Sequence, residues 1–464
     1  MSDRVSSGSK RLDAILGGGL PSNGINLIIG LPGSGKTILA QQYAFYSATP
    51  ERPAMYLSTV SEPLEKILRY GQTLSFFDRR AVGTSIFYED LGGVLNHEGL
   101  AGVLDKVGDL LKQRRPGVIV LDSFKALHPY AHRDEDFRRF LHDFAGRLSA
   151  FPTTSFWLGE YDYDEMAGSA EFAVADSILW LSTERMGARE MRVLQVLKLR
   201  GSDFLSGRHA YRLAAHGVEV FPRLADPGVH ERYELADTRI SSGIPLLDEM
   251  VGSGYWPGAS TLVAGPSGSG KTLMGLHFIF EGARNGEPGV IATLQEDEAQ
   301  LERIVNGFGW SLDEEGVTLM YRAPVDIYLD EWVHELLETV QATGARRVMI
   351  DSLGDLRATS SDETRFREYI YSLLQRCSRQ GTSVIMTQEV AELFGITRLS
   401  EFGISHVSDN VILLQFLRGH SRVKRGVTVM KTRASSHDPQ IREFEITSDG
   451  FVVGEHFPAE QDLR

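Results

Sequence analysis

The sequence contains one long internal repeat, and this repeat constrains the fold more than any other feature. The stretch SSGSKRLD begins at Ser6 and SSGIPLLD begins at Ser241, while the glycine-rich stretches GLPGSGKT and GPSGSGKT begin at Gly30 and Gly265. Both pairs are separated by the same offset of 235 residues. A chain of 464 residues is also too long for one ordinary hydrophobic core. The sequence therefore predicts two tandem copies of one domain.

The two copies share a strand–loop–helix pattern. In each copy a short apolar strand, INLIIG or STLVAG, runs into the glycine-rich loop and then into an apolar-periodic helix, TILAQQYAFYSA or TLMGLHFIFEGA. Apolar strands that alternate with helices favour a mainly parallel sheet covered on both faces. We therefore predict the α/β class, with helices flanking a mainly parallel sheet in each domain.

The stretch PRLADPGVHERYELADTR separates the copies and mixes proline, glycine and charge without a sustained apolar period. Such composition is typical of a linker or an extended arm. We place the boundary near Pro227, which predicts a first domain at 1–226 and a second at 227–464.

Composition narrows the function classes. No apolar run approaches the roughly 20 residues of a membrane-spanning helix, the first residues lack the apolar core of a secretory signal, and the single cysteine, Cys377, allows no internal disulfide. We therefore expect a cytoplasmic protein that does not contact a membrane. The formal net charge of -14 makes nucleic acid an unfavourable partner, because a phosphate backbone is bound by basic surfaces.

The pattern G-x-x-x-x-G-K-[ST] occurs in both copies, each time between a strand and a helix, as a phosphate-binding loop requires. The glycines let backbone N–H groups surround a phosphate, and the helix N-terminus adds positive charge. We expect Lys36 and Lys271 to reach the β/γ oxygens of a nucleoside triphosphate and Thr37 and Thr272 to face Mg²⁺. The predicted phosphate-loop residues are Gly33, Ser34, Gly35, Lys36, Thr37 and Ile38, and then Gly268, Ser269, Gly270, Lys271, Thr272 and Leu273.

An aspartate follows a β-branched and aliphatic run in each copy, in VIVLDSF at Asp122 and in VMIDSL at Asp351. This position puts a carboxylate at the carboxyl edge of a parallel sheet, beside the phosphate loop. One such aspartate could simply end a strand, but two at matching positions favour a role at Mg²⁺.

These motifs resemble the KaiC-type double-ring ATPases of the RecA superfamily. The resemblance rests on the SSGxxxLD stretches, the two phosphate loops, IVLDS and MIDSL, KLRGSD, and SDNVILLQF followed by VMKTRASSHDPQIREFEI, and it covers nearly all of the chain. It implies that each half is a RecA-like domain. It also implies a homo-oligomer of six chains stacked as two rings, with ATP and Mg²⁺ between neighbouring subunits.

The resemblance assigns further roles to two basic pairs and one aromatic residue. Lys198 and Arg200 in KLRG, and Lys431 and Arg433 in KTRA, would reach the phosphates held by a neighbouring subunit. Without this context, a basic pair on an edge strand would simply be solvated. Phe308, in NGFGWSLD, falls where the family stacks an aromatic ring on adenine, and packing in the core is its alternative role.

The family places a pair of glutamates after the strand that follows the first helix, where one carboxylate orients or deprotonates the attacking nucleophile. In the second half Gln295 and Glu296 occupy the pair. Glu296 is therefore our catalytic candidate together with Lys271, and it is also a candidate on the metal side. Capping of the following helix is the alternative role of Glu296.

The first half departs from this pattern. Val60 and Ser61 occupy the pair, and Glu62 is displaced by one residue. On a strand such a shift turns the side chain to the other face, although a loop tolerates it. Lys36 and Glu62 are the catalytic candidates of this half.

In GISHVSDNV, Ser405 aligns with an acceptor serine of the family and His406 with its neighbouring threonine. Ser405 is thus a candidate phosphosite, and a polar loop residue is the alternative.

The function we expect is ATP hydrolysis coupled to ring conformation and to signalling through a protein partner, with serine autokinase activity as a further option. A DNA-directed RecA-like motor or recombinase is the first alternative, which the acidic net charge disfavours. The second is a nucleotide-gated scaffold with little turnover, which the altered pair in the first half favours. Within the leading hypothesis, the first half retains nucleotide and the second hydrolyses it, unless Glu62 still reaches the attacking water.

Overall fold

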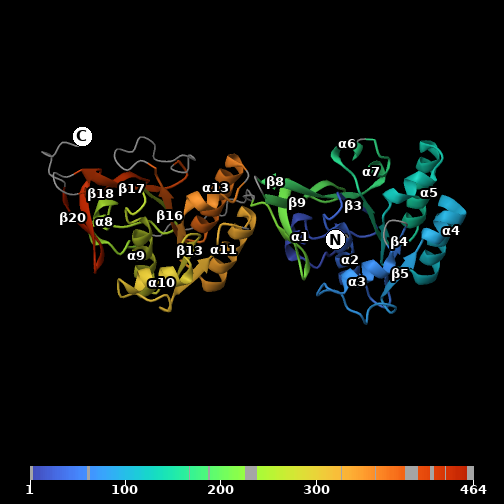
Figure 1. Ribbon diagram of the computed structural model, residues 1–464, viewed down its shortest axis with the longest axis horizontal. Coiled ribbons are helices and arrows are strands. Elements are labelled where there is room, and N and C mark those ends of the chain that lie inside the picture. The colour runs from blue at the N-terminus through green and yellow to red at the C-terminus, as the bar shows by residue number, and fades with distance from the viewer. Residues whose placement is uncertain are drawn as a thin grey trace. The chain divides into compact units, whose positions relative to one another are not determined.

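The computed structural model describes residues 4–59, 63–166, 168–186, 189–224, 238–325, 327–360, 362–391, 406–418, 423–433 and 435–456. The chain divides into two compact units, Met1–Arg223 and Leu224–Arg464 (Figure 1). The linker predicted around Pro227 lies outside the described residues, so the boundary between 226 and 227 stays a proposal.

The first unit contains a nine-stranded sheet in the order β11-β10-β9-β8-β3-β7-β6-β4-β5. Neighbouring strands from β8 to β5 are parallel, and β9, β10 and β11 extend the sheet by antiparallel pairing. The strands are β3 (Ile25–Gly30), β4 (Ala54–Ser58), β5 (Ile86–Asp90), β6 (Val118–Asp122), β7 (Thr154–Gly159), β8 (Ser177–Met186), β9 (Arg189–Leu199), β10 (Arg208–Ala214) and β11 (Gly217–Phe221).

Helices cover both faces of this sheet because alternate residues of each strand point to opposite sides. Leu27 and Ile29 pack against α4 and α5, whereas Ile28 packs against α2. A small separate ribbon joins β1 (Arg4–Val5) to β2 (Leu20–Pro21). The helices are α1 (Lys10–Ile15), α2 (Lys36–Ser47), α3 (Leu64–Gly71), α4 (Gly92–Arg114), the 3₁₀ helix η1 (Lys125–Tyr130), α5 (Asp134–Ser149), α6 (Tyr163–Met166) and α7 (Glu171–Val174).

The second unit repeats this sheet strand for strand, in the order β14-β13-β15-β16-β12-β17-β18-β19-β20. Its strands are β12 (Ser260–Gly265), β13 (Gly289–Thr293), β14 (Val317–Tyr321), β15 (Arg347–Asp351), β16 (Ser383–Glu389), β17 (Asn410–Arg418), β18 (Val423–Thr432), β19 (Arg442–Thr447) and β20 (Gly450–His456). Its helices are α8 (Pro245–Met250), α9 (Lys271–Arg284), α10 (Glu298–Asn306), α11 (Leu329–Thr343), α12 (Leu353–Arg357) and α13 (Glu363–Arg379). The prediction of two α/β units with mainly parallel, helix-flanked sheets is confirmed.

The repeated SSGxxxLD stretch closes a local hydrogen-bonded turn. Ser6 Oγ donates to Asp13 Oδ2 at 2.5 Å, and the backbone N–H of Ser7 donates to Asp13 Oδ1 at 2.8 Å. In the second unit, Ser241 Oγ donates to Asp248 Oδ2 at 2.6 Å. The aspartate therefore fixes the entry to the first short helix of each unit, which explains the recurrence of this stretch without a catalytic role.

One buried hydrogen bond occurs in both units, but its acceptor is a different type of side chain in each. The backbone N–H of Val218 donates to Gln42 Oε1 at 2.9 Å, and the backbone N–H of Phe451 donates to His277 Nε2 at 2.8 Å. Burial lowers the pKa of His277 to about 4. The imidazole is therefore neutral near pH 7, as an acceptor at Nε2 must be.

This contact predicts an acid-labile second unit. In the unfolded chain His277 titrates near pH 6.5, so between about pH 6.5 and about pH 4 the unfolded state gains a proton before the folded state does. The free energy of unfolding should fall by about 3 kcal/mol across this window. His277→Gln copies the residue of the first unit and should remove this fall while keeping the acceptor. Denaturant unfolding at pH 7 and pH 4.5, followed by tryptophan fluorescence, tests it; an equal loss of stability in both proteins would contradict the prediction.

Candidate nucleotide-binding sites

The first glycine-rich loop lies between the end of β3 and the start of α2. Gly33 and Gly35 have φ values of 76° and 91°, which L side chains rarely adopt. A Cβ on Gly35 would also lie 2.6 Å from a methyl carbon of Leu213. Lys36 is buried, and its Nζ donates to the carbonyls of Gly30 and Leu31, both at 2.9 Å. The loop thus forms a closed turn that points the first N–H groups of α2 outward, where an anion can accept them.

The second loop, between β12 and α9, has the same geometry. Gly268 and Gly270 have φ values of 71° and 102°, and Lys271 Nζ donates to Pro266 O at 2.9 Å. Desolvation lowers the pKa of both loop lysines, against the opposing effect of nearby carboxylates. The hydroxyls of Ser34 and Ser269 are buried at equivalent places and, among the described residues, lack a hydrogen-bond partner. Both loops therefore hold polar groups suited to further acceptors.

The predicted metal-side residues meet in each unit. Thr37 Oγ1 donates to Asp122 Oδ2 at 2.8 Å, and Thr272 Oγ1 donates to Asp351 Oδ2 at 2.6 Å. All four residues line pockets that contain the phosphate loops. Hydroxyl and carboxylate oxygens are ligands of the kind that Mg²⁺ takes, so these residues fit a magnesium ion bound with a nucleotide.

The two aspartates are held by different strands. Tyr56 Oη, on β4, donates to Asp122 Oδ2 at 2.5 Å, while Thr387 Oγ1, on β16, donates to Asp351 Oδ1. Desolvation raises the pKa of Asp351. Sequence reasoning missed both hydroxyls, because strand order decides which side chains reach the aspartate.

The first phosphate loop opens into a pocket of about 890 Å³. Its apolar wall comes from Ile67 and Tyr70 of α3, with Leu74 and Leu213. Tyr70 is half exposed, and the charged groups of Lys66 and Arg69 lie 5.9 and 5.1 Å from its ring centroid. The aromatic residue at this pocket is thus Tyr70, which sequence reasoning did not identify.

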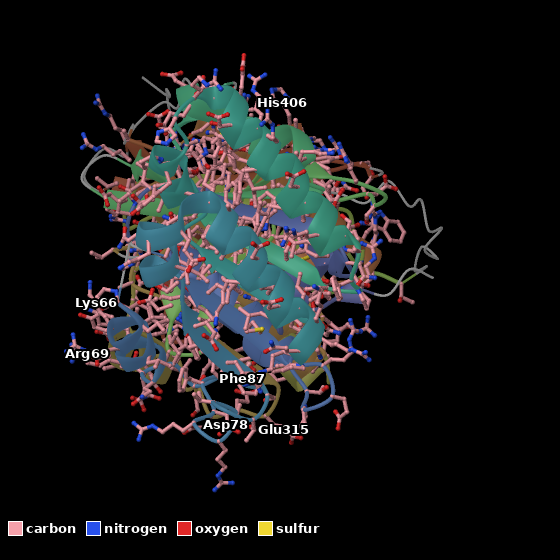
Figure 2. The ribbon with its side chains drawn as sticks, turned by 90° about the vertical axis from the view of Figure 1, so that its right-hand side faces the viewer. Lys66, Arg69, Asp78, Phe87, Glu315 and His406 are labelled. Carbon is pink, nitrogen blue, oxygen red and sulfur yellow. The ribbon has the colours of Figure 1, made fainter. Side chains whose placement is uncertain are left out.

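Lys66 and Arg69, the two cations beside that ring, project outward from α3 (Figure 2). Lys66 also lines the first pocket, whereas Arg69 donates from Nη2 to the hydroxyl of Tyr70 at 3.3 Å. The mouth of the first pocket therefore carries positive charge, which suits a nucleotide.

The second phosphate loop opens into a pocket of about 340 Å³, with an apolar wall of Ile304, Phe308 and Ile446. Phe308 is half-buried and packs on Trp310 with ring centroids 5.5 Å apart. Phe308 thus packs on the core and also lines the pocket, so stacking on adenine stays a prediction.

Glu296 lies in the second pocket with Lys271 and Asp351. Desolvation raises its pKa, and the charge of Asp351 adds to this effect. The N-cap of α10 is Asp297, which accepts from the backbone N–H of Gln300 at 2.8 Å. The capping role considered for Glu296 thus belongs to its neighbour, and the Glu296 carboxylate faces the site instead.

The corresponding pair of the first unit, Val60 and Ser61, and the displaced Glu62 lie outside the described residues, as does Ser405. Sequence reasoning also missed one further carboxylate in each pocket. Glu160 directly follows β7 and Glu389 ends β16, and each lines the pocket beside its loop lysine. The signal was available in the repeat, as WLGE and MTQE.

The basic pair of the first unit lies at the far end of the sheet from its own phosphate loop. Lys198 is in register with Ile178 of β8, next to Leu27 of β3, whereas the loop begins only after Gly30. Three residues of strand span about 10 Å, and Arg200 lies further still from the loop. Lys198 lies on β9, which is inside the sheet, and Arg200 directly follows that strand, so the edge-strand setting assumed for a merely solvated pair does not apply.

The second unit repeats this arrangement. Lys431 is in register with Val411 of β17, beside Leu262 of β12. Its Nζ donates to Ser408 O at 2.6 Å, and Arg433 donates from Nη2 to His406 O at 2.7 Å. In neither unit is the pair placed to act on the phosphate loop of the same unit.

Two sheets of RecA-like order, each with a phosphate loop, a loop lysine and a bonded threonine–aspartate pair, define a tandem P-loop ATPase. Comparison with known families agrees with this class. The family described as “ATPase: KaiC” matches residues 5–225 and again residues 240–457. The chain therefore belongs to the KaiC ATPase family.

Curated relatives match the chain over nearly its whole length. It is 28% identical to “Circadian clock protein KaiC3” of Synechocystis sp., with 98% of this chain and 92% of the relative covered. It is 27% identical to “Circadian clock oscillator protein KaiC” of Picosynechococcus sp., with 96% and 88% covered. Among the described residues, no helix is long and apolar enough to cross a membrane.

The apolar wall of the second pocket predicts a role for Phe308 in binding the base. In a Lys36→Ala background, which removes the loop lysine of the first site, Phe308→Ala should weaken ATP binding by about 1–3 kcal/mol, the usual value of base–aromatic stacking. Phe308→Tyr keeps the ring and should bind as the parent does. Equilibrium titration with ATP and Mg²⁺ measures the difference, and equal affinities of the alanine and tyrosine variants would show that the ring serves only the core.

Proposed function

We propose that the protein is an ATP-hydrolysing ring of identical subunits, six by resemblance, that couples nucleotide state to ring conformation and to signalling through a cytoplasmic protein partner. The observation that carries this proposal is the position of Lys198/Arg200 and Lys431/Arg433 at the opposite end of each sheet from the phosphate loop. Cations in this position suit the phosphates of a neighbouring subunit, so a single chain would hold incomplete sites.

We further propose that the two units divide the work. Both hold the loop lysine, the threonine and the strand-end aspartate, which supports nucleotide binding in both. Glu296 supports hydrolysis in the second unit, because its carboxylate lies in the pocket beside Lys271 and Asp351. The raised pKa of Glu296 also makes it a stronger base than an exposed glutamate.

The proposed reaction assigns a role to each group of the second site. Lys271 and the N–H groups of its loop bind the β- and γ-phosphates, and Glu296 orients the attacking water and accepts its proton. Thr272 and Asp351 would hold Mg²⁺, which neutralises the charge that develops on the phosphate oxygens. Lys431 and Arg433 of a neighbouring subunit would stabilise the same charge from the other side. Autophosphorylation at Ser405 stays a prediction from the sequence alone.

The trans-acting cations predict assembly that depends on nucleotide. With saturating ATP and Mg²⁺ at micromolar protein, the mass should be that of a closed oligomer. The double variants Lys198→Ala/Arg200→Ala and Lys431→Ala/Arg433→Ala should assemble less. Mass photometry or light scattering with and without ATP checks this, with Arg208→Ala, an exposed basic position on β10, as the matched control. A wild-type protein that stays monomeric would remove the proposal.

The division of work predicts unequal effects of two matched substitutions. Glu296→Gln should lower steady-state phosphate release by about 10²–10⁴-fold, the usual cost of losing a general base, and leave nucleotide binding intact. Glu62→Gln should change the rate little.

Glu298→Gln, at an exposed position two residues beyond Glu296, controls for the loss of one acidic group near α10. If Glu62→Gln loses most of the activity while Glu296→Gln keeps it, the first unit is the hydrolysing one and the proposed division is reversed.

A further inference from the structure

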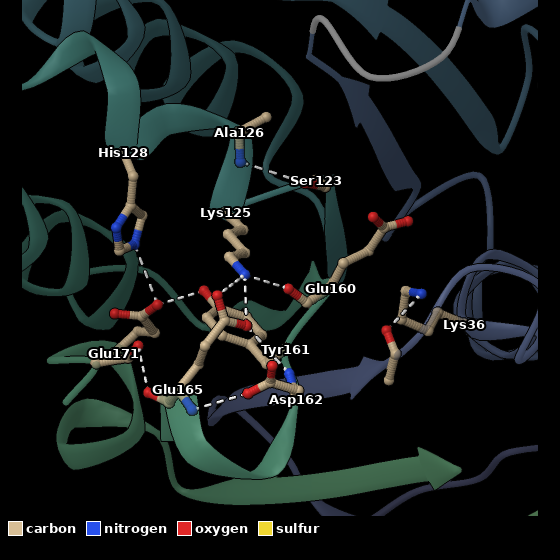
Figure 3. Close-up of polar contacts among 12 residues, drawn as sticks. Lys36, Ser123, Lys125, Ala126, His128, Glu160, Tyr161, Asp162, Glu165 and Glu171 are labelled. Atoms are coloured by element: carbon tan, nitrogen blue, oxygen red, sulfur yellow. Dashed lines mark hydrogen bonds and ion pairs between the residues drawn. The ribbon is translucent and has the colours of Figure 1, made fainter. Parts of the chain in front are cut away.

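A polar cluster lies beside the first nucleotide pocket and connects three segments of the first unit (Figure 3). Lys125 and His128 come from η1, the 3₁₀ helix that follows the aspartate of the metal side. Tyr161 and Glu165 belong to residues 160–166, which follow β7, and Glu171 begins α7. The function proposed above uses none of these five side chains.

Lys125, which lines the first pocket, forms hydrogen bonds to residues 160–166. Its Nζ donates to Glu160 O at 2.5 Å and to both carboxylate oxygens of Glu165 at 2.7 Å. The same ammonium lies 4.7 Å from the ring centroid of Tyr161. Because Lys125 also lines the first pocket, its contacts link that pocket to the segment behind it.

Glu171 is a buried carboxylate on a helix of only four residues. Its Oε1 accepts from Tyr161 Oη and lies 3.1 Å from His128 Nε2. Its Oε2 is buried and, within the described part of the chain, has no hydrogen-bond partner. Burial alone would raise the pKa of Glu171, but the hydrogen bonds from His128 and Tyr161 lower it. A charge kept at a position where an apolar side chain would be less costly points to a function.

The polar cluster lies between two groups that the proposed function uses. These are the loop lysine of the subunit's own first site and the basic pair proposed to act on a neighbouring subunit. At one end, Glu160 lies between Lys125 and Lys36 (Figure 3), and its charge opposes the effect of burial on the pKa of Lys36. At the other end, Lys198 Nζ donates to the carbonyls of Phe172 and Ala173 at 3.1 and 3.2 Å. Arg200 Nη2 also donates to Ala173 O, at 3.3 Å.

The second half of the sequence does not carry this cluster. In the aligned stretches DSFKALH and DSLGDLR, Gly354 takes the place of Lys125 and Arg357 that of His128. After the equivalent strand, Val390 takes the place of Tyr161. The cluster is therefore a property of the first unit and not of the duplicated fold.

We propose that Tyr161, Glu171 and His128 are positioning residues that set Lys198 and Arg200 according to the occupancy of the first nucleotide site in the same subunit. This inference rests on the proposed action of these cations on a neighbouring subunit. A triphosphate bound at Lys36 repels the carboxylate of Glu160 and displaces residues 160–166. Tyr161 transmits this displacement through Glu171 to α7, whose carbonyls hold Lys198 and Arg200. Occupancy of one first-unit site thereby prepares the site of the next subunit.

The test measures release of a fluorescent ATP analogue from full-length protein in a Lys271→Ala background, so that the first unit supplies the signal. Tyr161→Phe removes the donor to Glu171 and should speed release about tenfold, within the range usual for coupling between sites. Tyr163→Phe, at an exposed position two residues away, is the matched control and should leave the rate unchanged. An unchanged rate in Tyr161→Phe would overturn the inference.

Mixed oligomers then separate an effect on the neighbour from an effect on the own site. Tyr161→Phe subunits loaded with the fluorescent analogue and mixed with an excess of parent subunits loaded with unlabelled ATP should recover slow release, because the occupied parent subunits supply well-positioned cations to the Tyr161→Phe sites. A mixture of Tyr161→Phe with Lys198→Ala/Arg200→Ala subunits should not recover it, because both impair the same contribution. Recovery in this second mixture would mean that Tyr161 acts on its own pocket and would overturn the inference.

Lys198→Ala/Arg200→Ala subunits loaded with the fluorescent analogue and mixed with an excess of parent subunits loaded with unlabelled ATP test the proposed function separately. Slow release in this mixture supports action on the neighbour, and its absence would overturn both that action and the inference built on it. Should Tyr161→Phe fail to fold, Glu171→Gln keeps an acceptor for Tyr161 and loses the charge facing His128. It should speed release and follow the same pattern in mixtures, and a wild-type rate in Glu171→Gln would overturn the inference.

Discussion

The hydrogen bond between a loop threonine and a strand-end aspartate organises both units. Thr37 lies in the first turn of α2 and Asp122 ends β6, yet β7 separates β6 from β3, the strand that leads into the loop. The bond therefore forms only when the sheet has this strand order, and Thr272 and Asp351 impose the same condition on the second sheet. Once it forms, the loop lysine, the aspartate and the carboxylate that follows the intervening strand face one pocket. The strand order of the sheet therefore determines which chemical groups meet at the pocket.

The parts of this arrangement that are local in sequence could be predicted. The strand–loop–helix unit, the aspartate that ends an apolar run and the internal repeat all follow from spacing and periodicity. Groups that meet through strand order could not. Tyr56 reaches Asp122 because β4 lies next to β6, and Glu160 enters the pocket because β7 lies between β3 and β6. Tyr70 was missed for a different reason, since Thr73 lies 235 residues before Phe308 and the first pocket takes its aromatic residue from α3 instead.

The duplication preserved backbone geometry more closely than chemistry. Gln42 and His277 accept from equivalent backbone N–H groups, and the second hydroxyl on the strand-end aspartate comes from β4 in one unit and β16 in the other. Each exchange keeps a buried polar group satisfied, which is the condition a core imposes. The sequences of the two units differ at the glutamate pair, where Val60 and Ser61 correspond to Gln295 and Glu296. Two sites can therefore share binding groups and still differ in turnover.

The proposed action of the basic pairs on a neighbouring subunit requires that cations held within one chain remain available to another. Arg200 lies 3.5 Å from Asp176 and Arg433 lies 3.5 Å from Asp409, and all four side chains are partly exposed. Exposed ion pairs of this kind contribute only about 0–1 kcal/mol. A triphosphate at an interface that excludes water offers a stronger, charge-assisted hydrogen bond. In the proposed ring the cations would therefore favour the phosphates over these aspartates, while the backbone carbonyls that accept from the lysines and arginines set the direction in which the side chains point.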